Sequence, residues 1–173
     1  MKESFEDGLR LSGIIYLHAI SDSRMTHSSL QNLRMFRKLC GDSNLGNVIL
    51  ATTKWGITPP VDAYRREREL ASENGFWGMM IAAGSRVRRF ENSVASAQAL
   101  VEEILDGSEK FMPQIQQEVI KGKKLSETEA GAYLNEEIIA IQKKHQKDQE
   151  ILREEFKRAQ QDRKCARLVK ALD

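Results

Sequence analysis

The sequence is poor in cysteine and contains no long hydrophobic run. Its only two cysteines, Cys40 and Cys165, lie far apart, so we expect neither a disulfide framework nor a metal site of paired cysteines. No apolar segment approaches the ~20 residues that a membrane-spanning helix needs. The first ten residues lack an apolar core and carry acidic side chains, which argues against a secretory or mitochondrial leader. By elimination, we expect a reduced, cytoplasmic protein.

An excess of charge of either sign is also missing. The 27 Lys and Arg residues against 25 Asp and Glu residues give a formal net charge of +2. This balance gives no reason to expect nucleic acid or an acidic membrane surface as a partner. The charges are unevenly distributed, however. Residues 1–105 contain 25 charged and eight aromatic side chains, and the shorter segment 106–173 contains 27 charged and three aromatic side chains. We therefore expect a packed domain in residues 1–105, followed by a linker and charged helical tail in residues 106–173.

Strand-like and helix-like segments alternate in the first part of the chain. Short apolar runs predict three strands, GIIYLH (13–18), NVILATT (47–53) and SRVRRF (85–90). Apolar residues at helical spacing predict three helices, over residues 27–40, 61–73 and 93–105. Alternation of this kind predicts an α/β fold with a parallel sheet and right-handed crossovers. The last of these helices is expected to turn one apolar side toward the sheet, with Val94, Ala97, Leu100, Val101 and Leu105.

From Lys124 onward the pattern is helical and highly charged. Apolar residues recur at spacings of about three and four, at Leu134, Ile138, Ile141, Leu152, Phe156 and Ala159. His145 falls in the same row, and Asp148 interrupts it. Two interpretations have equal weight: a solvated helix that folds back on the domain or frays, and a short coiled coil that joins two copies.

The second predicted strand ends in the polar stretch Thr53-Lys54-Trp55-Gly56. In parallel α/β sheets, the loops at the carboxyl ends of the strands line the ligand crevice. The predicted strands place three loops there, at residues 19–25, 52–56 and 91–93. The stretch 52–56 is therefore a candidate ligand-binding loop.

In these features the chain resembles the second half of the G domain of fungal P-loop GTPase-like proteins. The resemblance spans roughly Gly8 to Leu105 and is carried by ISDSRM (20–25), the LRMFRKLCG helix (33–41) and the Thr-Thr-x-Trp turn (52–55). It implies part of a GTPase-like parallel sheet, with about three strands and flanking helices, and a bound guanine nucleotide, GTP or GDP.

The resemblance also implies which residues would contact the base. Such GTPases read guanine with a loop of the form Asn/Thr-Lys-x-Asp; Thr53 and Lys54 match its first two positions, and Trp55 fills the third. Gly56 stands where the aspartate should be, and glycine cannot supply the charge-assisted hydrogen bonds that select guanine. The second base-contacting loop of the family, which uses backbone N–H groups, falls on Asn92 and Ser93.

The phosphate-binding half of such a domain is missing from this sequence. It contains no G-x-x-x-x-G-K-[ST] motif, so this chain offers neither a phosphate cradle nor ligands for Mg²⁺. The missing motifs would lie upstream of Met1. Because phosphoryl transfer depends on them, we expect no GTP hydrolysis by this polypeptide alone.

The same absence would leave the strand at residues 13–18 without its usual neighbour, as an apolar sheet edge. We favour a fragment of a longer gene product over a half-domain that docks on a partner, by about two to one. The alternative function is a non-catalytic interaction protein that acts through its helical tail and exposed sheet edge.

Several other residues allow both a functional and a structural interpretation. His18 could approach a phosphate or a base, or it could be a core histidine. The basic strip Arg86, Arg88 and Arg89 could contact RNA but more often such a strip forms a solvated face. The tryptophans Trp55 and Trp77 could stack on a base or pack in a core. His27 and His145 are expected at the surface, and no His, Asp and Glu trio has metal-ligand spacing.

Overall fold

The computed structural model describes residues 10–22, 27–72, 76–107 and 109–169, and gives only the backbone for residues 27 and 162–169. By their contacts, the residues divide into two compact units, 1–131 and 132–173. This division falls later in the chain than the change of composition near Asp106.

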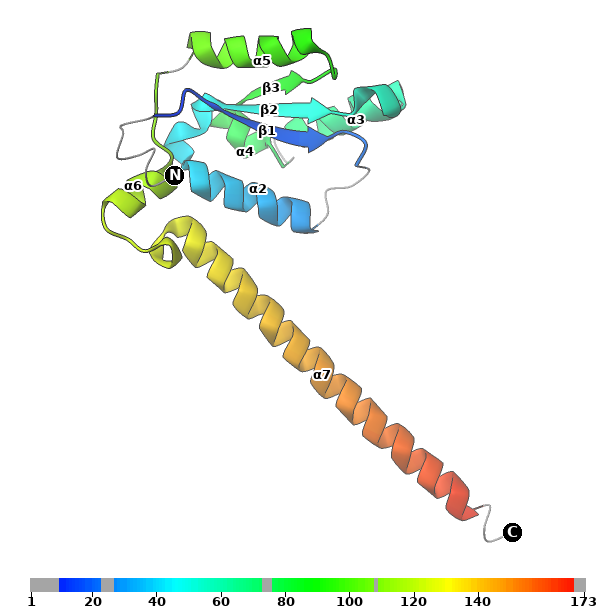
Figure 1. Cartoon of the computed structure of the whole chain (residues 1–173). Coiled ribbons are helices and arrows are strands. Elements are labelled where there is room, and N and C mark those ends of the chain that lie inside the picture. Colours follow the sequence, from blue (N-terminus) through cyan, green and yellow to red (C-terminus); the bar gives the residue numbers. More distant parts are fainter. Residues whose placement is uncertain (1–9, 23–26, 73–75, 108, 170–173) are drawn as a thin grey trace. The chain divides into compact units, whose positions relative to one another are not determined.

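The first unit is built on a three-stranded parallel sheet (Figure 1). The strands are β1 (Ile14–Ala19), β2 (Val48–Thr53) and β3 (Arg86–Arg89), in the order β1-β2-β3. In the parallel register, Ile14 lies opposite Val48, and Ile49 lies opposite Arg86. The prediction of an α/β fold with a parallel sheet is confirmed. The central strand β2 is buried over its first five residues, which fits a strand covered on both faces.

Six α-helices occur in the described part of the chain. They are α2 (His27–Cys40), α3 (Pro60–Ala71), α4 (Gly78–Ala82), α5 (Val94–Gly107), α6 (Gln114–Ile120) and α7 (Glu129–Val169). The sequence predicted α2, α3, α5 and a long C-terminal helix to within a few residues. It did not predict α4 and α6, because five and seven residues are too few for a periodic pattern to identify a helix.

The two faces of the sheet have separate apolar cores. On one face, Leu50 of β2 packs with Leu33 of α2, Leu70 of α3 and Met80 of α4, around the fully buried Trp77. On the other face, Ile49 and Ala51 pack against Leu100 and Ile104 of α5, with Ile15 and Phe90 beside them, and Figure 1 shows α5 on that side of the sheet.

The predicted inward side of α5 is wrong in part. Leu100 and Ile104 are buried, whereas Val94, Val101 and Leu105 are 75%, 49% and 64% exposed. The reason is that Leu100 and Ile104 pack on Ile49 and Ala51 of β2, while Glu103 beside them forms ion pairs with Arg86 and Arg88 of β3. The Val94, Val101 and Leu105 row consequently lies on the side of α5 away from Glu103, toward β1.

Strand β1 forms one edge of the sheet. Within the described residues, no other strand pairs with its outer side. Ile15 packs in the α5-side core, so strand alternation places Leu17 on the same face, where it is 60% exposed. The apolar sheet edge that the sequence predicted at residues 13–18 is therefore present at β1.

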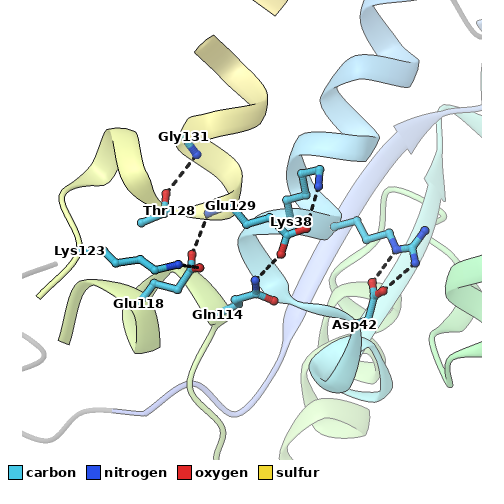
Figure 2. Close-up of polar contacts among 9 residues, drawn as sticks. Lys38, Asp42, Gln114, Glu118, Lys123, Thr128, Glu129 and Gly131 are labelled. Carbon is cyan, nitrogen blue, oxygen red and sulfur yellow. Dashed lines mark hydrogen bonds and ion pairs between the residues drawn. The ribbon is translucent and has the colours of Figure 1, made fainter. Parts of the chain in front are cut away.

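At the end of the first unit, residues 128–131 make polar contacts (Figure 2). The Glu129 carboxylate binds Lys38 at 2.7 Å and accepts a hydrogen bond from the Gln114 amide. The Thr128 hydroxyl accepts from the Gly131 backbone N–H at 3.1 Å, which is the geometry of a helix N-cap. None of the described helices is both long and apolar enough to cross a membrane.

Candidate functional site

The two loops that the sequence marked as base-contacting lie at the same edge of the sheet. Residues 54–59 follow β2, and residues 90–93 follow the neighbouring parallel strand β3. The Phe90 N–H donates to the Thr52 carbonyl at 2.8 Å, which joins the carboxyl ends of the two strands. The structure therefore brings the residues Thr53, Lys54 and Trp55 close to the loop of Asn92 and Ser93.

Thr53 and Lys54 have different surroundings. The half-buried Thr53 hydroxyl donates to the His18 carbonyl at 3.3 Å, so it is used to hold the ends of β1 and β2 together. Lys54 has a left-handed backbone, with φ of 63°, and an exposed side chain. Its carbonyl accepts from the Thr58 hydroxyl at 3.1 Å, which closes the turn after β2. The amino group and aliphatic stem of Lys54 are thus at the surface of this edge.

The Trp55 ring is part of a polar and aromatic cluster. Its indole N–H donates to the Thr52 hydroxyl at 3.0 Å. The Arg89 guanidinium lies over the indole ring, 4.3 Å from its centroid, and 4.8 Å from the centroid of the Tyr64 ring. Glu67 of α3 binds this guanidinium through both carboxylate oxygens and raises the pKa of Arg89. One face of the indole is therefore occupied by a side chain of the protein.

The loop after β3 is held by serine contacts. Asn92 has a left-handed backbone, with φ of 56°, and is exposed. The Ser93 hydroxyl accepts from the Ser96 N–H at 3.1 Å, and the Ser93 N–H donates to the Ser96 hydroxyl at 3.3 Å. These reciprocal bonds form a capping arrangement at the start of α5. The Ser93 N–H thus already has an acceptor within the loop.

Gly56 stands in open space at this edge. A Cβ atom built on it would meet no heavy atom within 4 Å, and its φ lies outside the left-handed range. A larger side chain at this position can therefore be accommodated without a clash.

A surface hollow of about 480 Å³ borders the Trp55 cluster rather than the two loops. Its lining comes from α3 and β3: Glu67, Arg68, Ala71, Val87, Arg88 and Arg89. It lies on the outer side of β3 and includes none of the predicted base-contacting residues.

The remaining candidate residues are engaged within the protein. The three arginines of the basic strip bind carboxylates on the flanking helices, Arg86 and Arg88 with Glu103, and Arg89 with Glu67. Burial raises the pKa of the Cys40 thiol to about 12, which makes it a poor nucleophile. Trp77 is fully buried, so it cannot stack on a base.

No group of three or more His, Cys, Asp or Glu residues with metal-binding geometry occurs in the part of the chain that the structure describes. His145 is exposed, as expected. The side chains of His27 and Cys165, and the loop at 23–26, lie outside the described residues.

His18 is a core histidine. It is 9% exposed and meets the Trp77 ring edge-on, with the ring centroids 5.9 Å apart. Burial lowers the pKa of His18 below its ordinary value of 6.5, and the negative charge of Asp22 opposes part of this shift.

This shift predicts a loss of stability in acid. Above about pH 6.5, His18 is neutral in both states; below it, the unfolded chain binds the proton first, so the free energy of unfolding decreases. We expect the free energy of unfolding, measured with urea, to fall more between about pH 7.5 and about pH 5.5 for the native protein than for His18→Phe. An equal difference for both proteins would contradict this role of His18.

The cluster of Thr52, Trp55, Tyr64, Glu67 and Arg89 was not found from the sequence. Tyr64 and Glu67 are three residues apart on α3 and so share a face, which is the one available signal.

Comparison with known proteins finds no matching family model, no matching curated protein and no matching solved structure.

Proposed function

We propose that the first unit is the base-binding part of a P-loop GTPase-like domain and that it binds a guanine nucleotide at the carboxyl edge of its sheet. The observation that carries the proposal is the adjacency of the two loops, because they follow neighbouring parallel strands joined by the bond from Phe90 to Thr52. The exposed Lys54 stem would pack along the base. The loop of Asn92 and Ser93 would contact its other side.

The phosphate groups of the nucleotide would need contacts from a phosphate-binding loop. The sequence contains no phosphate-binding loop, so the proposal assigns nucleotide binding to this chain but no catalytic step. The outer edge of β1 offers a place for a strand that carries such a loop. The exposed apolar row of α5 lies on the same side and offers a surface for a helix that follows this strand.

The missing carboxylate gives a direct test by gain of function. We expect Gly56→Asp to raise the preference for GDP over ADP by at least about tenfold, because a carboxylate that accepts two N–H donors contributes roughly 1.5–3 kcal/mol. The measurement is the shift of the melting temperature in titrations with Mg²⁺-GDP and Mg²⁺-ADP.

Gly46→Asp is the matched control. Gly46 also stands in open space, but it precedes β2 and so lies at the opposite end of the strand. The control adds the same charge and should leave the GDP preference unchanged. If Gly56→Asp and Gly46→Asp give the same ratio of GDP to ADP affinity, the guanine-loop assignment is wrong.

A second candidate function is protein interaction through the β1 edge. The observation that favours it is the exposure of Leu17, Val101 and Leu105 beside an unpaired strand. The expected partner presents an apolar strand to β1. A photo-crosslinking residue at Leu17 should then capture a defined protein in cells, whereas the same residue at Val61 on α3, which is 82% exposed, should not. Equal capture at both positions would argue against a dedicated surface.

A further inference from the structure

The second unit is a single helix that carries a row of apolar side chains at its surface. Leu134, Ile138, Ile141 and Leu152 of α7 are 49%, 43%, 50% and 65% exposed. Their spacings place them on one face of the helix, and the exposed His145 falls in the same row. Together with Asp148, Glu155 and Ala159, they fill the inward positions of a seam nearly four heptads long.

We infer that a second copy of this chain covers this row and runs antiparallel to it, so that the two α7 helices form a coiled coil. The pairing is centred between Gln146 and Lys147. Around this centre, Ile141 packs against Leu152 of the second copy, and Leu134 packs against Ala159 of the second copy. Each of these layers occurs twice because of the twofold symmetry.

The two central polar residues of the row, His145 and Asp148, become partners in this arrangement, and the third, Glu155, faces Ile138 of the second copy. His145 faces Asp148 of the second copy, and the symmetry repeats the pair on the other side of the centre. Both side chains are exposed in the single chain. An imidazolium and a carboxylate can satisfy each other inside a seam, whereas either one alone would be a buried group without a partner. Asp148, which interrupts the apolar row, therefore contacts His145 of the second copy.

The same two residues select orientation and register. A parallel pair in register would place Asp148 against Asp148 of the second copy, and like charges at an inward position are destabilising. An antiparallel pair shifted by one heptad would have fewer facing layers and would place Asp148 against Leu152 or Ile138. The centred register keeps every inward position of the seam opposite another one, and it sets Glu155, near the end of the seam, against Ile138 of the second copy. The centred antiparallel register is thus the favoured one.

The first test is the mass of the full chain in solution. Sedimentation over a concentration series should give a dimer, and Ile141→Asp should raise the dissociation constant by roughly 100-fold or more, because it places two carboxylates in apolar layers. Ile139→Asp is the matched control: Ile139 is 49% exposed and lies two residues away, on the other side of the helix. It should change the dissociation constant by less than about threefold. A monomer at all concentrations would overturn the inference.

A charge exchange tests the polar layers. His145→Asp alone should weaken the dimer, because it sets carboxylate against carboxylate across the seam. The double variant His145→Asp with Asp148→His restores the opposite-charge pair and should recover most of the affinity. Failure of the double variant to recover affinity, with helix content unchanged by circular dichroism, would contradict the pairing of these two positions.

Cysteine exchange tests the orientation. In a background with Cys165→Ser, chains with Ile141→Cys and chains with Leu152→Cys are mixed and oxidised. The antiparallel pair predicts the mixed disulfide between the two kinds of chain, since facing inward positions lie close enough for a disulfide. Disulfides between identical chains would instead indicate a parallel pair and would overturn the inference. Because these readouts concern α7 alone, they are independent of nucleotide binding.

Discussion

Replacing Trp77 by alanine is expected to lower the free energy of unfolding of the first unit by about 3–5 kcal/mol. Trp77 is fully buried, and it is the largest of the fully buried side chains. It packs where α3 and α4 meet, beside Leu70 and Met80, and the edge of His18 contacts its ring. Removing the indole leaves a cavity that these neighbours cannot fill. Urea unfolding followed by circular dichroism measures the loss.

Two further variants separate the cavity from other effects of the substitution. Trp77→Phe should cost clearly less than Trp77→Ala, because most of the apolar volume remains. It also removes an indole N–H for which the described residues supply no hydrogen-bond acceptor. Val61→Ala changes an 82% exposed side chain and should stay within about 0.5 kcal/mol of the native protein. A cost below about 1 kcal/mol for Trp77→Ala would contradict the central position of this ring.

Gly131→Ala is expected to destabilise the protein by about 1–3 kcal/mol, although alanine is the better helix former. A Cβ atom at this position would lie 1.9 Å from the Leu125 carbonyl oxygen and 2.8 Å from its carbon. Both are backbone atoms, so a side-chain rotation cannot relieve the clash. The chain must move, and the cap between the Thr128 hydroxyl and the Gly131 N–H would be strained. The measurement is again the free energy of unfolding.

Gly46→Ala is the matched control for Gly131→Ala. Its Cβ would meet no heavy atom within 4 Å, and its φ lies outside the left-handed range. The substitution should therefore be neutral or slightly stabilising, since it reduces the freedom of the unfolded chain. If both glycine substitutions have the same effect, the close approach of α7 to the Leu125 turn does not determine the stability.

The sequence predicts the elements of this fold better than the way they face each other. Helix α2 is predicted well because its apolar spacing is regular and Gly41, with φ of 82°, ends it. Helix α5 has two adjacent apolar rows, one with Leu100 and Ile104 and the other with Val101 and Leu105. Periodicity alone cannot decide which row faces the sheet. The packing of Leu100 and Ile104 on β2, with the ion pairs of Glu103 to β3 beside it, depends on tertiary structure.

The candidate site was also predictable only in part. The position of the two loops was predictable, because loops that follow neighbouring parallel strands meet at one edge of the sheet. The cover of Trp55 by Arg89 was not, because it joins residues from three separate segments through Glu67. The cap between Ser93 and Ser96 is a local contact and could have been predicted from their spacing.

The strand order has a consequence for the synthesis of the protein. Each strand pairs with the next one along the chain, so the sheet can grow in the order in which the ribosome releases it. Ile14 pairs with Val48, so at about 5–20 residues per second β1 waits only a few seconds for its partner. All three strands precede α7 in the chain, so each new chain has its sheet strands before its last helix is available to another copy.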